Sequence, residues 1–116
     1  MPAARHELRI EQGASFDVSI TYYDSAGSAV NLTSYTARAK FRPTYDAAPI
    51  LTLTTENGGI TLGGTAGTIS LTASAVTTAA FSSPSNGVYD LELANPSGNV
   101  TRMIEGKYNV TPEATK

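Results

Sequence analysis

Two acidic residues are the strongest candidates for chemistry in this chain. Asp90 and Glu92 are two positions apart in an expected strand, so both side chains point to the same side. Paired carboxylates serve as acid and base in glycosidases and as ligands of hard metal ions. Arg102 lies on the strand expected to face them, and cross-strand charge pairs are common on exposed sheets. We therefore interpret the two acids as surface charges.

The other reactive groups are isolated in the sequence. His6 is the single histidine and lies in a polar N-terminal segment, without a second group to fix it as a base or ligand. The glycine-rich stretch 63–67 superficially resembles a phosphate-binding loop, but it contains no lysine and precedes an expected strand. The chain has no cysteine. We predict no catalytic residue, metal ligand or cofactor, expect no small-molecule ligand, and expect that the protein is not an enzyme.

A basic stripe is the clearest surface feature. Arg38, Lys40 and Arg42 alternate with apolar residues, which places all three on the outer side of one strand. Binding of nucleic acid by stacking would need several aromatic residues interleaved with these charges, and the chain has a net charge of -2. We interpret the stripe as a solvated face, or as one that prevents edge-to-edge pairing, and predict no nucleic-acid partner.

The composition is that of a globular domain with few charges. The 116 residues fit one domain, 1–116, and we expect flexible ends at 1–7 and 112–116. Charged residues make up 16%, below the usual share of about 25%, and such surfaces lose little when a neighbour buries them. No apolar run approaches about 18 residues, and the N-terminus has no apolar signal segment, so we expect neither a membrane span nor a signal peptide.

Alternation of apolar and polar residues predicts an all-β fold. In the segment 16–23, Phe16, Val18 and Ile20 point one way and the polar residues the other. Turn signals follow at Asp24–Gly27, Asn57–Gly59 and Asn95–Gly98. The expected strands are 8–10, 16–23, 35–42, 50–55, 60–62, 68–72, 88–94 and 100–110. About eight short strands with one short helix predict an antiparallel β-sandwich, either immunoglobulin-like or a partly closed barrel.

Two segments depart from this alternation. Residues 73–81 are rich in alanine and lack glycine and proline, which predicts a short helix with Thr72 as its N-cap and with Val76, Ala79 and Ala80 at helical spacing. Pro84 and Gly87 are expected to bracket the exit of this helix. In segment 100–110, Arg102 and Glu105 interrupt both possible registers. We interpret Gly106 as a bulge that switches the exposed side of that strand.

One stretch carries a family resemblance. Residues 30–38 read Val-Asn-Leu-Thr-Ser-Tyr-Thr-Ala-Arg, and they follow Phe16-x-Val18-x-Ile20 and an Asp24-x-x-Gly27 turn. The segments Gly87–Leu93, Gly98-Asn99-Val100-x-Arg102 and Glu105–Gly106 come later. Together, from about residue 10 to residue 112, they resemble the small β-sandwich proteins among the virion structural genes of tailed bacteriophages, and related N-terminal domains of baseplate and tail-fibre-attachment proteins.

The resemblance implies a structural role and no catalytic or ligand-binding residue. It implies a protein of the virion, assembled in the cytoplasm of a host bacterium, that docks to other virion proteins in the tail, baseplate or fibre-attachment region. We expect a homo-oligomer or a symmetric assembly. From edge position and composition, the candidate contact residues are Arg9, Glu11, Tyr23, Arg38, Lys40 and Arg42.

Two alternative functions remain open at this point. A capsid decoration or cement protein would have the same kind of sequence as a tail component. A carbohydrate-binding module is the second alternative, because sandwiches of this size often bind glycans. Such modules usually present several exposed aromatic rings, whereas this chain has no tryptophan and six tyrosines, several of them at inward positions.

Overall fold

The protein is a two-sheet β-sandwich. The structure, a computed structural model, describes residues 4–82 and 85–114. The larger sheet contains β1 (Ala4–Arg5), β2 (Leu8–Glu11), β4 (Thr36–Arg42), β5 (Leu51–Thr54), β8 (Ser85–Ala94) and β9 (Val100–Thr111). The smaller sheet contains β3 (Phe16–Thr21), β6 (Ile60–Leu62) and β7 (Thr68–Ala73), and the two helical turns are η1 (Gly64–Ala66) and α1 (Ala75–Ala79). The predicted all-β sandwich with one short α-helix is confirmed.

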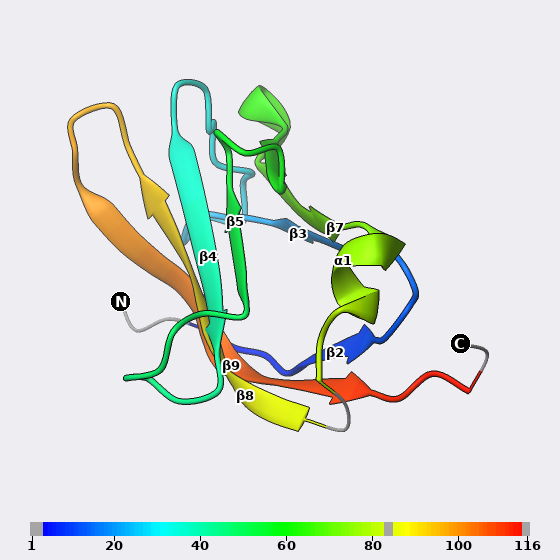
Figure 1. The fold of residues 1–116 in the computed structure, drawn as a ribbon. Coiled ribbons are helices and arrows are strands. Elements are labelled where there is room, and N and C mark those ends of the chain that lie inside the picture. Colours follow the sequence, from blue (N-terminus) through cyan, green and yellow to red (C-terminus); the bar gives the residue numbers. More distant parts are fainter. Residues whose placement is uncertain (1–3, 83–84, 115–116) are drawn as a thin grey trace.

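The order of strands is β1-β9-β8-β4-β5 in the larger sheet and β3-β7-β6 in the smaller one. Figure 1 shows β3 running across the direction of β4. All pairs are antiparallel except those of β1 and β2, which both lie parallel to β9. These two pairings differ from the expected antiparallel ones. They form because β9 is 12 residues long and offers its outer edge to the N-terminal segment.

Both ends of the described chain are tied to the sandwich. Of the expected flexible ends, residues 4–5 form β1, and the backbone N–H of Glu113 donates to Oε1 of Gln12 at 3.1 Å. Residues 1–3 and 115–116 lie outside the described part of the chain.

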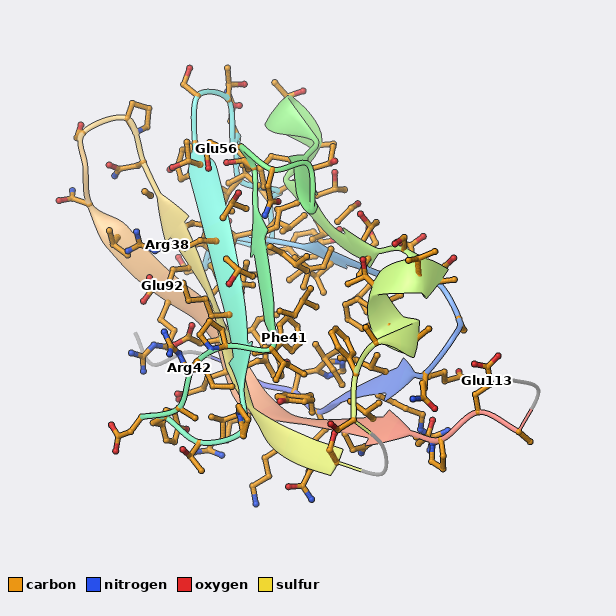
Figure 2. The ribbon with its side chains drawn as sticks, viewed as in Figure 1. Arg38, Phe41, Arg42, Glu56, Glu92 and Glu113 are labelled. Atoms are coloured by element: carbon orange, nitrogen blue, oxygen red, sulfur yellow. The ribbon has the colours of Figure 1, made fainter. Side chains whose placement is uncertain are left out.

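The core lies between the sheets, where the inward residues of alternating strands meet. Phe41 is fully buried, and its ring stacks on Tyr89 with centroids 5.2 Å apart. The same ring meets Phe16 edge-on at 6.1 Å and Tyr108 at 5.5 Å. Because Phe16 belongs to the smaller sheet, this cluster joins the two layers. Figure 2 shows Phe41 pointing inward, while Arg38 and Glu92 point away from the core.

The short helix begins later than predicted and buries a different residue. Its N-cap is Ser74, not Thr72, and the Ser74 hydroxyl accepts a hydrogen bond from the N–H of Thr77. Val76 is 83% exposed, whereas Thr78 is fully buried. A helix of five residues has too few turns for an apolar stripe, so it is fixed by Thr78, whose hydroxyl meets the turn between β2 and β3. Pro84, expected at the exit of this helix, lies outside the described residues.

The bulge in β9 is at a different residue from the one predicted. Leu91 pairs with Ile104 and Glu92 with Arg102, so Met103 is the extra residue and Gly106 stays in register opposite Tyr89. Gly106 has another purpose: a Cβ atom there would lie 2.1 Å from the carbonyl oxygen of His6. Glycine at this position lets the N-terminal segment pass close to β9.

Candidate interaction surface

The outer side of β4, β8 and β9 carries the densest group of charges in the described chain. Ala37, Ala39 and Phe41 of β4 are buried, so the residues between them face outward. On β8, Tyr89 and Leu91 are buried in the same way. We call this surface the charged face; it consists of Arg38, Lys40 and Arg42 on β4, Asp90 and Glu92 on β8, and Arg102 and Glu105 on β9.

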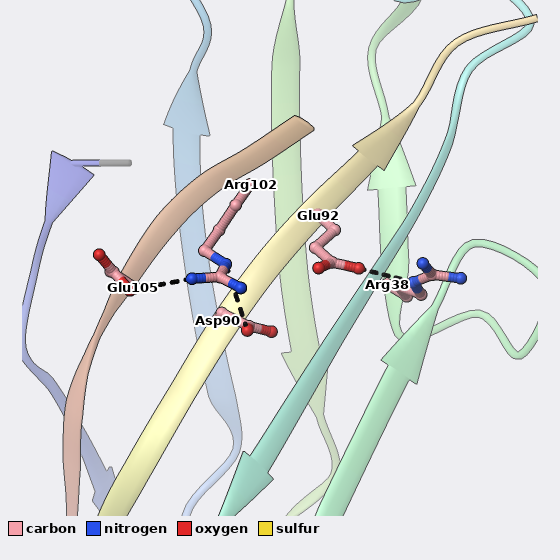
Figure 3. A network of polar contacts seen from close by, with 5 residues as sticks. All are labelled: Arg38, Asp90, Glu92, Arg102 and Glu105. Carbon is pink, nitrogen blue, oxygen red and sulfur yellow. Dashed lines mark hydrogen bonds and ion pairs between the residues drawn. The ribbon is translucent and has the colours of Figure 1, made fainter. Parts of the chain in front are cut away.

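The basic stripe on β4 lies directly beside the acidic residues of β8. The strand register sets Arg38 opposite Glu92 and Lys40 opposite Asp90. Nε of Arg38 lies 2.9 Å from Oε1 of Glu92 (Figure 3). The Arg38 side chain is 57% exposed, so this ion pair contributes little to the free energy of unfolding, at most about 1 kcal/mol. The pair places a positive and a negative group side by side on adjacent strands.

The bulge at Met103 brings two residues of β9 onto the charged face. Arg102 and Glu105 are three positions apart and would point to opposite sides of a regular strand. With one extra residue between them, both lie on the outer side. Nε of Arg102 lies 3.6 Å from Oδ2 of Asp90, and its Nη1 lies 3.4 Å from Oε2 of Glu105. Arg102 therefore lies between two carboxylates, as Figure 3 shows.

The carboxyl of Asp90 has a raised pKa on this face. Partial burial raises the pKa of its carboxyl, the neighbouring Glu92 carboxylate raises it further, and Arg102 opposes both effects. Asp90 and Glu92 line a shallow hollow of about 340 Å³, in which each carboxylate has an arginine partner. Among residues 4–82 and 85–114, no group of three or more His, Cys, Asp or Glu side chains is placed to hold a metal ion. The arrangement presents paired charges of both signs at the surface of three adjacent strands.

The structure brings three of the six predicted contact residues together. Arg38 and Lys40 lie exposed on the charged face, while Arg42 is half-buried and donates a hydrogen bond from Nη1 to the carbonyl oxygen of Ala47 at 2.6 Å. This bond makes Arg42 a support of the loop between β4 and β5. The other three lie elsewhere: Arg9 and Glu11 are exposed on β2, and Tyr23 is 58% exposed at an isolated bridge to Ala29.

Two exposed apolar residues beside the charged face were not found from the sequence. Tyr45 is 72% exposed and lines the hollow that contains Asp90 and Glu92. Val100 is 51% exposed and lines a second hollow of about 250 Å³ at the other end of the face. The only sequence signal for Tyr45 is its place in a loop between Pro43 and Pro49, outside any alternating segment. The ion pair between Arg38 and Glu92 was missed as well, because sequence alone does not tell which strands are neighbours.

His6 acts through its backbone. Its side chain is exposed, as predicted, while its N–H donates to the carbonyl oxygen of Glu105 at 3.1 Å. Its own carbonyl oxygen accepts a 2.6 Å hydrogen bond from the hydroxyl of Tyr89. Burial raises the pKa of Tyr89 to about 12. These contacts hold the N-terminal segment against β9.

Two sequence comparisons with known proteins find no match. No protein-family model matches the chain, and a search of curated proteins finds no match to its sequence. None of the helices in the described part of the chain is long and apolar enough to cross a membrane.

Proposed function

We propose that this chain is a structural virion protein of a tailed bacteriophage, which docks to other virion proteins in the tail, baseplate or fibre-attachment region. The proposal starts from the resemblance carried by residues 30–38 and 87–93, and the all-β sandwich agrees with the fold that this resemblance implies. The observation that carries the docking role is the charged face, a surface of paired charges on three adjacent strands.

The most distinctive stretch of the resemblance, residues 30–38, has a structural task. Leu32 is 1% exposed, and its backbone N–H donates to the carbonyl oxygen of Gly64 at 2.8 Å. Oδ1 of Asn31 accepts hydrogen bonds from the N–H and the hydroxyl of Thr33, and Ser34 adopts a left-handed backbone with φ 68°. The loop thus inserts one leucine into the core and leads directly into β4. A chain that shares these residues is expected to share this end of the sandwich.

The charged face has the physical properties that a docking surface needs. Its ion pairs place charges of both signs on adjacent strands, which offers a partner a defined pattern of charge to match. Its hollows are shallow and bordered by Tyr45 and Val100, and the surrounding residues on β5 are threonines, whose hydroxyls form adaptable hydrogen bonds. In an assembly with many copies, even a weak contact of this kind becomes effective through multivalency.

The location of the protein in the particle tests this proposal. Antibodies raised against the purified chain would be applied to phage particles from the strain that carries the gene, and bound antibody would be detected by immunogold electron microscopy. We expect gold at the tail, baseplate or fibre attachment. Gold confined to the head would contradict this placement and favour a capsid decoration protein. Particles that carry no gold and no peptide of this chain by mass spectrometry would contradict a virion role altogether.

A further inference from the structure

The charged face is complementary in charge to a second copy of itself. It consists of a basic stripe on β4 next to an acidic stripe on β8, and the strand register puts two of the three β4 cations level with an acid: Arg38 with Glu92 and Lys40 with Asp90. Consider a two-fold axis that lies between the two facing copies, runs parallel to the strands and passes over the line midway between β4 and β8. This axis places β4 of one copy over β8 of the other. The rotation does not change the position of a residue along the strand direction. Opposite charges therefore meet in the row of Arg38 and Glu92 and in the row of Lys40 and Asp90.

We propose that two copies of this chain associate face to face through the charged face, about this two-fold axis. Arg38 then lies over Glu92 of the second copy, and Lys40 lies over Asp90 of the second copy. Symmetry repeats both contacts, as in any isologous dimer. The inference stands on the geometry of the face and does not depend on the virion role.

The remaining residues of the face fit the same arrangement. β9 and β5 lie at equal distances on either side of the axis, and the register sets Arg102 level with Thr54 and Glu105 level with Thr52. Arg102 and Glu105 of β9 therefore each meet a threonine hydroxyl of the second copy, and no like charges are placed opposite each other in these rows. In the next row, Arg42 lies level with Val88 and with Lys107 of β9, so this row brings no acid to the contact.

The size of the face suits a weak dimer. Strands β5, β4, β8 and β9 contain 4, 7, 10 and 12 residues, and at about 3.4 Å per residue and about 4.8 Å between strands they outline about 540 Å². A standard stable interface buries about 800 Å² on each partner. The dimer is thus expected at the low end of stable association, and its charges make it sensitive to salt.

A nucleic acid fits this face less well than a second copy does. A phosphate backbone over Arg38 and Lys40 would also lie beside the carboxylates of Asp90 and Glu92, one strand away. Two of the three β4 cations are already engaged, Arg38 by Glu92 and Arg42 by the carbonyl oxygen of Ala47. A partner that carries a basic stripe beside an acidic stripe matches the charges of β4 and β8 better than a uniformly negative phosphate backbone does.

Charge-reversed variants that are mixed with each other test the proposal. Lys40→Asp makes positions 40 and 90 both acidic, and Asp90→Lys makes both basic. Each variant alone sets like charges opposite each other in the dimer, whereas an equal mixture sets acid against base in every contact between residues 40 and 90. Within each chain the two like charges remain, so a rescue by mixing reports only on contact between copies.

The measurement is sedimentation velocity over a range of protein concentrations at low salt, with circular dichroism to check that each variant is folded. We expect a dimer of the unsubstituted protein that dissociates in 1 M NaCl, and a dissociation constant at least about tenfold higher for either variant alone. The mixture should return to within about threefold of the unsubstituted value. As a matched control, Asp17→Lys makes the same substitution on an exposed position of the smaller sheet and should leave the dissociation constant unchanged.

Three results would overturn the proposal. An unsubstituted protein that stays monomeric at millimolar concentration would show that a second copy does not bind this face. Dimers that are unaffected by either substitution would place the contact elsewhere, and variants that fail to recover on mixing would rule out this two-fold arrangement. A failure of the dimer leaves the location of the chain in the virion open to its own test, because the immunogold experiment detects the chain whichever face it uses for docking.

Discussion

At the scale of single residues, a few buried polar groups hold segments that the apolar core does not reach. Thr78 and Tyr89 are the clearest cases, because each is buried and each places its hydroxyl against backbone from a distant part of the chain. A buried backbone group that loses its hydrogen-bond partner costs far more than an exposed ion pair gains. Substitutions at these two hydroxyls are therefore expected to affect stability more than any substitution at the charged face.

Thr78→Val should destabilise the protein although it preserves shape. The Thr78 hydroxyl donates to the carbonyl oxygen of Ala14 at 2.8 Å and accepts from the N–H of Gly13 at 3.1 Å. Valine leaves both groups without this partner, so we expect the free energy of unfolding to fall by about 1–3 kcal/mol, measured by urea denaturation. The control Thr72→Val lies on an exposed strand position and should change it by less than about 0.5 kcal/mol. An equal loss in both variants would contradict this role for Thr78.

The raised pKa of Tyr89 predicts that the protein loses stability at alkaline pH. Burial raises its pKa from 10.0 to about 12, so between these values the folded chain keeps a proton that the unfolded chain releases. The free energy of unfolding therefore falls as pH rises from 10 to 12, by at most about 2.7 kcal/mol from this group. Burial also raises the pKa of Tyr108, which adds to the fall.

Tyr89→Phe separates the contribution of this group from that of Tyr108. The variant lacks the hydrogen bond to His6, so we expect it to be about 1 kcal/mol less stable at neutral pH. Its stability should then fall less steeply between pH 10 and pH 12 than that of the unsubstituted protein. Urea denaturation at several pH values measures both effects, and parallel pH profiles for the two proteins would contradict the assignment.

At the scale of elements, β9 organises the larger sheet. It pairs with β8 along one edge and with both β1 and β2 along the other. The bulge at Met103 sets which residues of β9 face outward, and Gly106 sets how closely the N-terminal segment passes. The charged face and the N-terminal strands thus both depend on local irregularities of one strand.

Gly106→Ala should release the N-terminal strand while leaving the rest of the sandwich folded. A Cβ atom at this position would lie 2.1 Å from the carbonyl oxygen of His6, so the segment must move away from β9. We expect a loss of about 1–3 kcal/mol in stability and faster hydrogen exchange in residues 4–6, followed by mass spectrometry.

Gly27→Ala provides the comparison for this effect. Gly27 has a φ of +84° in open space, so alanine there costs about 1 kcal/mol through backbone strain alone. It should not change exchange in residues 4–6. If that exchange rose equally in both variants, it would reflect global unfolding, and the specific contact at Gly106 would be wrong.

At the scale of the whole molecule, one aromatic cluster joins the two sheets. Phe41 from β4 contacts rings from β3, β8 and β9, and among these only β3 belongs to the smaller sheet. The two layers therefore share a single core, and the described chain is expected to unfold as one cooperative unit.

Phe41→Ala should destabilise the protein more than the substitutions at Thr78, Tyr89 or Gly106. It removes a fully buried ring from the centre of the cluster, and such changes cost about 3–5 kcal/mol. We expect a large fall in the thermal midpoint and a weaker near-ultraviolet circular dichroism signal, because the remaining rings lose their fixed packing. Tyr45→Ala removes an exposed ring and should leave both almost unchanged. A small effect of Phe41→Ala would mean that the sheets are held together elsewhere.

The sequence by itself determined which residues face inward. Alternation placed Ala37, Ala39 and Phe41 in the core and Arg38 and Lys40 outside, and turn residues such as Asp24 and Gly27 marked where the chain reverses. These features depend on nearest neighbours along the chain, because successive side chains of a strand point to opposite sides. For the same reason eight of the nine strands were expected at approximately their observed bounds, whereas β1 was not.

Only the tertiary structure decided which strands lie side by side. The contact of Arg38 with Glu92 joins residues 54 positions apart, and the parallel pairing of β1 and β2 with β9 joins the two ends of the chain. The position of the helix also depends on packing, since Thr78 of α1 bonds the distant turn between β2 and β3, and the bulge at Met103 is defined only by the pairing of β9 with β8. Pairing between distant strands depends on the fit of whole faces, and no local pattern of residues encodes that fit.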